Sequence, residues 1–390
     1  MKLNINGYFL RYLNAGLGKH SYELIKHLNK DGKDVHLFIP NDNTYDDGKL
    51  SILKDVHIHK HGSIRKMGND YYDARLWEFS LYRKLKHEKD SILFSPYFSC
   101  SPNLIQHEIV TVGDIIQYLF PQQYAASIPP YLVNLYNKHY LKYVKKIITF
   151  SEHSKKDIIK YFHFEPENIF SIPLGVSDIY KPITNDEEKC FIKQKYLLPD
   201  NFILYLGGYD YRKNVIELLK AFKKLKSYTS QKDIYLILVG TIPPKRRKLI
   251  PDIKKAIDES GEEKFIRAIG YVPEEDLPYI YSLARLFVYP SIYEGFGFPV
   301  LESIACGTPT IACNASSIPE TLNREDILYN PGDSNILAQR MKGVLEDDSY
   351  WKELSIWGIA RSKEFTWNKT AKRTEEVINS IKTCELVISS

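Results

Sequence analysis

Paired cysteines are missing from this sequence. Its 390 residues contain five cysteines, and no two of them form a CxxC pair. Disulfide frameworks and structural zinc sites both depend on paired cysteine spacing. We therefore expect reduced thiols in a cytoplasmic chain. The cysteines are Cys100, Cys190, Cys306, Cys313 and Cys384.

Long apolar runs are missing as well. No stretch approaches the roughly 20 apolar residues that a membrane-spanning helix needs, and Asn and Arg interrupt the opening MKLNINGYFLRYLN. We expect neither a membrane span nor a signal peptide. Charge of one sign does not dominate, since the net charge is +5, which by itself does not indicate a nucleic-acid partner. An apolar content of 44% and a charged content of 26% are typical of a globular protein.

Several motifs of known chemistry are also absent. The sequence has no GxxxxGKS/T phosphate loop, no HExxH zinc motif and no GxSxG serine elbow. No Asp-x-Asp pair stands at a strand end where it would hold a metal against a diphosphate. We therefore predict no metal site and no cofactor. A bound phosphate would have to be met by cationic side chains and helix N-termini.

What the sequence does contain is a regular alternation of short apolar runs and longer amphipathic segments. Residues 16–33, GLGKHSYELIKHLNKDGK, have helical periodicity, and the apolar run 34–40 follows them. This alternation predicts an α/β fold with parallel sheets wound by helices. The predicted strands are 34–40, 55–59, 91–96, 107–114, 145–151, 202–208, 234–240, 265–270, 285–290 and 308–313.

The length fits two domains. Residues 172–189, rich in Pro, Gly and charge, are predicted to link them. We place an N-terminal Rossmann-like domain at 1–180 and a C-terminal one at 181–365. Residues 366–390 are predicted to form a helix that belongs to either domain, one option being that it packs back on the N-terminal one. Two such doubly wound domains facing a central cleft would bind ligands beyond the carboxyl ends of their strands.

Two acidic residues stand close together in YEGFGFPVLESIACGTPTI, residues 293–311. Glu294 is predicted to lie in a loop, and Glu302 in the first turn of a helix that starts near Pro299. The amides between them can hold an anion while the acids bind hydroxyl groups. The plainer interpretation makes Glu302 a helix-terminal charge and the glycines a loop requirement. The amides concerned belong to Gly295, Phe296, Gly297 and Phe298.

Two cations precede another predicted helix, in YLGGYDYRKNVIELLKAF over residues 205–222. A predicted strand ends at Gly207 and Gly208, and Arg212 and Lys213 follow, although helix starts favour acids. A bidentate Arg and a point-charged Lys together suit a diphosphate. The alternative is a solvated basic turn.

Two further positions at predicted strand ends have two interpretations each. Gly16, in NAGLGKHSYELIKHL, permits a close approach to a phosphate or sugar, or simply a tight turn. The full GxGxxG fingerprint is missing because Ser21 replaces its third glycine. Asp114, in TVGDIIQYL, either points into the cleft or caps the segment that follows it.

Taken together, these motifs resemble the retaining glycosyltransferases of family 4, or group 1 glycosyltransferases, which have the two-domain GT-B fold. The resemblance extends over nearly the whole chain and is most specific between residues 148 and 320. It rests on YEGFGFPVLESIACGTPTIA, GGYDYRKN, GYVPEEDLPYIYSLARLFVYPS, SEHSKKDIIKYF, SIPLGV and FTWNKTAKRTEEV.

The resemblance implies roles for individual residues. Glu302 matches the acid that binds the ribose hydroxyls of the donor nucleotide, and Glu294 the acid that binds hydroxyls of the donor sugar. Arg212 and Lys213 match the cations that neutralise the diphosphate. Further implied donor contacts are Gly16, Gly208, Tyr271, Val272 and the amides of Gly295, Phe296, Gly297 and Phe298.

One position departs from the family pattern. Similar proteins often carry His before the acid that Asp114 matches, near the reacting sugar, and this chain has Gly113 there. The candidate catalytic residues are therefore Glu294, Lys213 and Arg212, together with Asp114, whose role that departure puts in question.

The implied activity is retaining, metal-independent transfer of a hexose-type sugar from a UDP- or GDP-sugar to a glycan, a lipid-linked or a small acceptor. We see no carboxylate nucleophile, which favours same-face attack. The alternatives are a non-catalytic nucleotide-sugar-binding module and a sugar-nucleotide epimerase of the same fold. A glycosidase built on Glu294 and Glu302 would not need Arg212 and Lys213 beside them.

A membrane contact is a further expectation. The segment KHYLKYVKK, residues 138–146, would present its lysines to an anionic membrane surface or a lipid diphosphate. This predicts a peripheral location at the cytoplasmic face of a membrane. The alternative is a solvated helix face. The lysines are Lys138, Lys142, Lys145 and Lys146.

Overall fold

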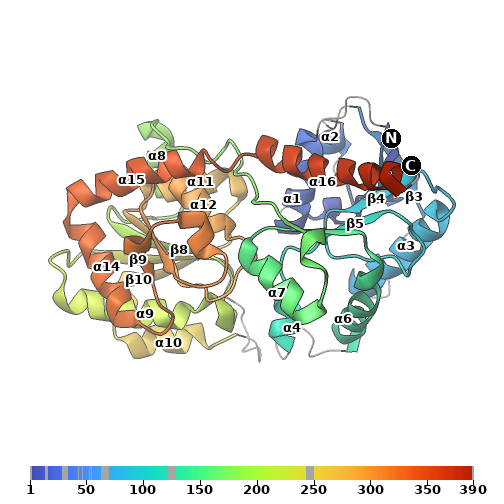
Figure 1. Ribbon diagram of the computed structural model, residues 1–390. Coiled ribbons are helices and arrows are strands. Elements are labelled where there is room, and N and C mark those ends of the chain that lie inside the picture. The colour runs from blue at the N-terminus through green and yellow to red at the C-terminus, as the bar shows by residue number, and fades with distance from the viewer. Residues whose placement is uncertain are drawn as a thin grey trace. The chain divides into compact units, whose positions relative to one another are not determined.

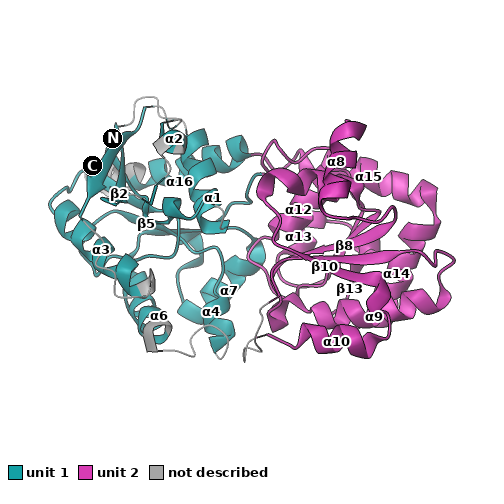
Figure 2. Cartoon of the chain, turned by 180° about the vertical axis from the view of Figure 1, so that it is seen from behind, with its two compact units in different colours: residues 1–175, 367–390 teal, residues 176–366 magenta. Residues whose placement is uncertain are grey.

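The chain folds into two compact units (Figure 2). Unit 1 comprises residues 1–175 and 367–390, and unit 2 comprises residues 176–366. The first break therefore falls after residue 175, whereas the sequence analysis placed it near residue 180. The structure is a computed structural model, and it describes residues 2–13, 16–28, 34–42, 44–45, 47–51, 53, 55–62, 70–121, 128–242 and 250–388.

Unit 1 is built on a seven-stranded parallel sheet of order β3-β2-β1-β4-β5-β6-β7 (Figure 1). Its inner strands are continuous apolar runs because helices cover both faces of the sheet. Ile92, Leu93 and Phe94 of β4, for example, are all buried. The strands are β1 Lys2–Asn6, β2 Asp34–Pro40, β3 His57–His61, β4 Ser91–Ser95, β5 Glu108–Thr111, β6 Lys146–Thr149 and β7 Ile169–Ser171.

The helices of unit 1 cover opposite faces of this sheet. Ile25 of α1 and Ile378 of α16 share one buried cluster with Ile5 of β1. Trp77 of α3 packs in a second cluster with Leu93, whose side chain points to the other face. The C-terminal helix α16 thus belongs to unit 1 and lies beside α1 (Figure 1). The helices are α1 Gly16–His27, α2 Asp47–Leu50, α3 Asp70–Leu85, α4 Ile116–Leu119, α6 Ile128–Tyr140, α7 Glu152–Phe162 and α16 Trp367–Ile388.

Unit 2 has a six-stranded parallel sheet of order β10-β9-β8-β11-β12-β13. Its strands are β8 Phe202–Leu206, β9 Tyr235–Val239, β10 Ile266–Gly270, β11 Leu286–Tyr289, β12 Thr310–Cys313 and β13 Leu328–Tyr329. Its helices are α8 Asp186–Lys195, α9 Val215–Tyr228, α10 Ile253–Ser260, α11 Leu277–Leu283, α12 Phe298–Ala305, α13 Ile318–Leu322, α14 Ser334–Glu346 and α15 Asp348–Ser362. Within the described parts of both units, no helix combines the length and apolar character that crossing a membrane requires.

Each sheet has a point where the winding reverses. In unit 1 the chain moves outward from β1 to β2 and β3 and then returns to place β4 on the other side of β1. In unit 2 it moves outward from β8 and returns to place β11 beside β8. The loops after the two neighbouring strands diverge at such a point, and ligands bind there in open α/β sheets. The two reversal points, β1/β4 and β8/β11, are therefore the first places to examine.

The predicted α/β class with two doubly wound, Rossmann-like sheets is confirmed. Three strands are absent from the predicted list. β7 and β13 are three and two residues long and too short to show a pattern, and in β1 polar residues alternate with the two apolar ones. The predicted linker 172–189 ends in helix, because α8 begins at Asp186. Asn185 caps that helix by accepting the amides of Glu187 and Glu188, so part of the polar composition belongs to a helix start.

Candidate active site

Glu294 is the centre of a cluster of polar side chains at the β8/β11 reversal point. Arg212 and Lys213 come from the turn after β8, and Glu294 lies in the loop after β11, 82 residues from Arg212 in sequence. Oε1 of Glu294 accepts hydrogen bonds from Nη1 of Arg212 at 2.6 Å, Nζ of Lys213 at 2.7 Å, the Tyr289 hydroxyl at 2.9 Å and Oγ of Ser291 at 2.5 Å. The sheet topology thus brings two separate sequence motifs into one site.

Hydrogen bonds of the main chain join the loop after β8 to the loop after β11, and join Glu294 to the loop after β12. The carbonyl of Arg212 accepts the amide of Ile292 at 2.9 Å. The amide of Glu294 donates to Oγ of Ser316 at 2.8 Å, and its carbonyl accepts the hydroxyl of Ser317 at 2.9 Å. Glu294 is therefore held through its side chain and its main chain, as a preorganised electrostatic site requires.

The charges of this cluster are largely shielded from water. The side chains of Arg212, Lys213 and Glu294 are 12%, 13% and 14% exposed. Burial lowers the pKa of Lys213. Burial raises the pKa of Glu294, but the charges of Lys213 and Arg212 outweigh it and leave that pKa below its ordinary value. A second acid, Asp210, lies 3.4 Å from Nε of Arg212.

The sequence analysis assigned the two cations to a diphosphate and Glu294 to a sugar, whereas the structure joins all three in one ion-paired group. Glu294 is thus itself a negative partner for the cations at the start of α9. Lys213 donates to Glu294 and, at 2.7 Å, to Tyr289, which accounts for two of its three N–H groups. Oε2 of Glu294 accepts no hydrogen bond from any described residue. One ammonium hydrogen and one carboxylate oxygen remain for a ligand.

The start of α12 adds backbone amides to unit 2's candidate site. Its N-cap, Gly297, has a φ of 98°, and a Cβ at this position would lie 2.7 Å from Cδ1 of Ile318. Glycine is therefore required here. The amides of Gly295, Phe296 and Gly297 make no hydrogen bond within the described part of the chain. Such amides at a helix N-terminus can bind an anion.

The predicted position of Glu302 in the first helical turn is wrong. α12 begins at Phe298, so Glu302 lies in its second turn, beyond the strongest effect of the helix dipole. Glu302 is 6% exposed, and Oε2 accepts the Tyr281 hydroxyl at 3.3 Å. Burial and the charge of Glu302 also raise the pKa of Tyr180. Glu302 is a buried acid held among tyrosines.

The other predicted donor contacts of unit 2 lie at strand ends. Gly208 follows β8, and its carbonyl accepts the hydroxyl of Tyr205. Tyr271 and Val272 follow β10 directly. Tyr271 is 64% exposed and offers its ring to a ligand, whereas Val272 is buried and offers its main chain.

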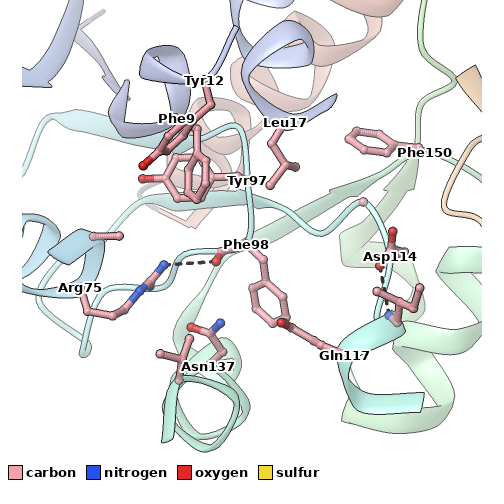
Figure 3. A pocket seen from close by; sticks show the side chains of 14 residues that line it. Phe9, Tyr12, Leu17, Arg75, Tyr97, Phe98, Asp114, Gln117, Asn137 and Phe150 are labelled. Carbon is pink, nitrogen blue, oxygen red and sulfur yellow. Dashed lines mark hydrogen bonds between the residues drawn. The ribbon is translucent and has the colours of Figure 1, made fainter. Parts of the chain in front are cut away.

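A pocket of about 560 Å³ lies at the β1/β4 reversal point of unit 1 (Figure 3). Four aromatic side chains from the two diverging loops line it: Phe9 and Tyr12 after β1, and Tyr97 and Phe98 after β4. The rings of Phe9 and Tyr97 meet edge to face, with 4.4 Å between their centroids. An aromatic wall of this kind is typical of a ligand pocket in an α/β sheet.

The structure shows the surroundings of Asp114 and Gly16, the two sequence positions in unit 1 with two interpretations each. Asp114 lines the pocket of unit 1, and its Oδ1 accepts the amide of Ile116 at 3.0 Å, which fits the interpretation as a cap of the segment that follows. Gly16 is the first residue of α1, and a Cβ there would meet nothing within 4 Å. A Cβ at Gly18 would instead lie 2.2 Å from the carbonyl oxygen of Tyr12. Packing therefore requires the second glycine of the GLG motif and not the first.

Gly113, the departure from the family pattern, is explained by its neighbour Phe150. A Cβ at position 113 would lie 2.4 Å from Cε2 of Phe150. The Phe150 ring, which also lines the pocket, is held edge to face against buried His20 at 4.8 Å. The aromatic ring thus occupies the space that a larger residue at position 113 would need.

Two polar residues of the pocket, Arg75 on α3 and Asn137 on α6, were missed by the sequence analysis. Nη1 of Arg75 lies 3.0 Å from Oε2 of Glu78, which is fully buried. Tyr97 donates to Oε1 of Glu78 at 2.5 Å. Nε of Arg75 and Oδ1 of Asn137 are buried and have no hydrogen-bond partner in the described structure. Arg75 and Glu78 are three residues apart on a helix, a spacing too common on helix surfaces to mark a site.

Comparison with known proteins places the chain in a family. The model of Glycosyl transferases group 1 matches residues 187–360, and that of Glycosyltransferase Family 4 matches residues 15–178. The O-antigen chain mannosyltransferase B of Escherichia coli is 31% identical over 96% of this chain and 97% of its own length. The serotype-specific mannosyltransferase WbdA of Escherichia coli is 30% identical over 58% of this chain and 27% of its own.

Solved structures share the fold at lower identity. A sucrose-phosphate synthase from Thermosynechococcus elongatus has a TM-score of 0.74 at 18% identity and covers 98% of this chain and 100% of its own. The Anabaena protein HepE in complex with UDP has a TM-score of 0.72 at 17% identity, over 97% and 99%. Given the full-length mannosyltransferase match and the two family models, the chain belongs to the group 1, or family 4, glycosyltransferases.

Proposed function

We propose that the protein is a retaining hexosyltransferase that moves a mannose-type sugar from a nucleoside diphosphate to a glycan acceptor. The observation that carries this proposal is the Glu294 cluster, in which two buried cations stand beside an acid with one oxygen left for a ligand. The names of the relatives support the sugar, because both Escherichia coli proteins are mannosyltransferases and one of them acts on an O-antigen chain. The donor base is proposed to be uridine or guanosine.

The donor would be bound by unit 2. Arg212, Lys213 and the amides at the start of α12 would hold the diphosphate, while Oε2 of Glu294 accepts a hydrogen bond from a sugar hydroxyl. Glu302 would bind the ribose, and Tyr271 would lie beside the base. Cationic side chains and amides then supply the charge stabilisation that other enzymes take from a metal ion.

Same-face attack is the chemistry that fits this cluster. The bond from C1 of the sugar to the diphosphate oxygen breaks, the acceptor oxygen bonds to C1 on the same face, and its proton passes to a departing phosphate oxygen. Arg212 and Lys213 stabilise the negative charge of the leaving group. Glu294 is unsuited to be a nucleophile, because its Oε1 accepts four hydrogen bonds and the two cations lower its pKa.

The acceptor would be bound by unit 1. The aromatic pocket at the β1/β4 reversal point is large enough for a sugar, and Asp114 on its wall would accept a hydrogen bond from an acceptor hydroxyl. Gly16 would let a ligand approach the start of α1, since no atom of the described chain lies within 4 Å of a Cβ built there.

A peripheral membrane contact is proposed for α6. Tyr131, Leu132 and Leu135 on this helix are 54%, 46% and 48% exposed, and Lys138 follows them. An exposed apolar strip with adjacent basic residues binds anionic bilayers. The segment 138–146 is not one helix face, because α6 ends at Tyr140 and β6 begins at Lys146.

Vesicle flotation tests the membrane contact. Vesicles that contain phosphatidylglycerol should retain the wild type, while neutral vesicles and the double variant Leu132→Ser/Leu135→Ser should not. Equal retention of the wild type by both vesicle types would contradict a contribution of anionic lipids to binding. Full retention of the variant would contradict the role of α6.

A nucleotide panel tests the donor site. We would measure thermal shifts with UDP, GDP, ADP, TDP and CMP on the wild type and on Glu302→Ala, with and without EDTA. One diphosphate should stabilise the wild type regardless of EDTA, and Glu302→Ala should bind it roughly ten- to a hundredfold more weakly. The matched control is Glu259→Ala, an exposed acid of α10. Unchanged affinity in Glu302→Ala would contradict the ribose assignment, and loss of the shift with EDTA would contradict the metal-free site.

Product analysis tests the reaction. The sugar nucleotide of the base found above is incubated with a methyl glycoside, and the anomeric configuration of the product is read by NMR. A product with the donor's configuration supports retention, and the opposite configuration contradicts it. A changed sugar nucleotide without acceptor would indicate an epimerase, and binding without turnover would indicate a binding module.

A further inference from the structure

We propose that the pocket of unit 1 selects an uncharged sugar ring of the acceptor and excludes phosphorylated groups. The proposal rests on the function proposed above and names the class of acceptor group that the pocket takes. It stands on the charges, the unpartnered polar atoms and the aromatic rings of the pocket.

The first observation is the charge around the pocket. Arg75 and Asp114 are the charged side chains among its described lining residues, and they are opposite in sign. The charge of Arg75 is already met by Glu78, 3.0 Å away. Glu78 is in turn fixed by Tyr97, and by Asn6 at 3.3 Å. The described lining and the partner of Arg75 thus contribute one cation and two acids, Glu78 and Asp114, and a phosphate placed in the pocket would meet net negative charge.

The second observation is the pair of buried polar atoms without a partner. Nε of Arg75 can donate a hydrogen bond and Oδ1 of Asn137 can accept one. Figure 3 shows the Asn137 amide directed toward Phe98 across the pocket. A buried polar atom without a partner destabilises the protein until a ligand or water bonds it. A sugar hydroxyl is a donor and an acceptor at once and can satisfy both atoms, whereas a phosphate dianion cannot donate to Asn137.

The third observation is the shape of the walls. Phe9, Tyr12 and Phe98 are half-buried and present rings to the pocket. Aromatic faces pack against the apolar C–H face of a pyranose, while its hydroxyls point to the few polar groups. Phe150, whose ring fills the space beside Gly113, lies on the side of the pocket opposite Arg75 (Figure 3). The pocket thus combines aromatic rings with a few polar side chains that can form hydrogen bonds.

The contrast with the donor site supports the assignment. The Glu294 cluster balances two cations, Arg212 and Lys213, against two acids, Glu294 and Asp210, and adds the open amides of a helix N-terminus. Among its described lining residues, the unit 1 pocket has one cation, Arg75, which is paired with Glu78, and one acid, Asp114. The two sites therefore divide the chemistry of the reaction, because one is equipped for a diphosphate and the other for hydroxyl groups.

Matched glycosides test the proposal. We would measure the binding of methyl α-mannoside, methyl α-glucoside and methyl α-galactoside to the full chain by saturation-transfer NMR and calorimetry, and of the 6-phosphate of each. At least one neutral glycoside should bind about tenfold or more tightly than its own 6-phosphate, the difference expected from one unfavourable charge contact. Equal or tighter binding of the phosphates would overturn the proposal and indicate an anionic acceptor group, such as a lipid phosphate.

Two variants test whether the preference for neutral glycosides over their 6-phosphates arises in this pocket. Glu78→Gln leaves the shape nearly unchanged and releases the charge of Arg75, so it should improve the binding of the 6-phosphates relative to the neutral glycosides. Asn137→Ala should weaken the neutral glycosides about three- to tenfold through one lost hydrogen bond. Gln106→Ala, at an exposed position of the same unit, is the control. If Glu78→Gln does not fold, the proposal is still tested by the comparison of neutral and phosphorylated glycosides on the wild type and by the effect of Asn137→Ala.

Failure of this proposal can be told from failure of the proposed function. A nucleotide shift and transfer to some other acceptor, with no neutral glycoside bound, would leave the function standing and overturn the pocket's role. Neither nucleotide binding nor transfer would overturn the function itself. An unchanged ratio of neutral to phosphorylated binding in Glu78→Gln would contradict the charge argument.

Discussion

The two reversal points of this protein have the same topology and opposite chemistry. At β8/β11 the diverging loops carry Arg212, Lys213 and Glu294, which meet in one ion-paired group. At β1/β4 the diverging loops carry aromatic rings around a pocket. The winding of a sheet thus decides where a ligand can bind, and the side chains of the loops decide which ligand it is.

The buried acids of the two sites also differ in their hydrogen-bond partners. Glu294 is shared by two cations and keeps one oxygen without a described partner. Glu78 is shared by Arg75, Tyr97 and Asn6 and is fully buried. We expect the first acid to serve the ligand and the second to hold Arg75 in place. The following predictions test this comparison, from the largest expected effect to the smallest.

Removing the acid of the donor site should have the largest effect. Glu294→Ala leaves two buried cations without their shared partner, and we expect a loss of about 3–5 kcal/mol in the free energy of unfolding. Glu294→Gln should lose less, because its amide oxygen still accepts hydrogen bonds. Urea unfolding of both variants measures this, with Glu259→Ala as control. Equal stability of wild type and Glu294→Ala would show that the cluster is not a mutually dependent group.

Removing one cation should slow the reaction more than it weakens the fold. Lys213→Ala is expected to lower kcat by about 10²–10³ through lost stabilisation of the leaving diphosphate. Lys220→Ala, an exposed lysine of the following helix α9, is the matched control. The measurement is kcat at saturating donor and acceptor. An unchanged kcat in Lys213→Ala would contradict its role at the leaving group.

Acid should destabilise unit 1 through His20. Burial lowers the pKa of His20 to about 4, below the ordinary value near 6.5, so the unfolded chain binds this proton more readily. Stability is therefore unaffected above pH 6.5 and falls as the pH drops toward 4, by about 3 kcal/mol at most for one group. All eleven histidines lie in unit 1, between His20 and His163.

Unfolding free energies of the wild type and of His20→Leu between pH 4 and pH 7.5 test this expectation. The difference between the two proteins should change with pH below 6.5 and stay constant above it. Parallel profiles would mean that His20 is charged in the folded state or open to water.

Filling the space at Gly113 should disturb the acceptor pocket alone. Gly113→Ala brings a Cβ within 2.4 Å of the Phe150 ring, and such overpacking costs about 1–3 kcal/mol. The double variant Gly113→Ala/Phe150→Leu should recover part of the lost acceptor binding, since the smaller side chain leaves room. Nucleotide binding by unit 2 should not change. Full acceptor binding by the single variant would show that Phe150 moves freely.

A matched glycine substitution in unit 2 should stabilise the protein instead of destabilising it, and this change in stability should be the smallest of the predicted effects. Gly343 lies within α14, and a Cβ there would meet nothing within 4 Å. Gly343→Ala should therefore stabilise the protein by about 0.4–1 kcal/mol through helix propensity and a less flexible unfolded chain. Thermal unfolding measures this, and destabilisation would contradict the open space around the site.

Much of the fold could be predicted from local pattern. The runs DVHLFIP and FILYL are rich in apolar residues, as strands covered on both faces are, and they form β2 and β8. The ion-paired motifs could also be found, because a loop rich in glycine and charge between a strand and a helix is a local feature. The placement of Glu302 failed because the helix starts at Phe298 after a left-handed Gly297, a detail of backbone geometry that composition does not contain.

The pocket residues could not be predicted for a different reason. Arg75 and Asn137 lie on helices α3 and α6, where their neighbours in sequence are ordinary amphipathic residues. Their function depends on which strand loops they face, and this is decided by tertiary packing. The reason for Gly113 was hidden in the same way, since the ring that excludes a side chain there belongs to Phe150 after another strand.

Hydrogen–deuterium exchange with one ligand at a time tests the central claim most directly. The full chain would be compared alone, with the nucleoside diphosphate found in the panel, and with a neutral methyl glycoside. The account predicts that the nucleotide slows exchange in residues 207–214 and 294–298 of unit 2, and that the glycoside slows exchange in residues 96–99 and 113–117 of unit 1. Protection of the same unit by both ligands would contradict the division of donor and acceptor between the two reversal points.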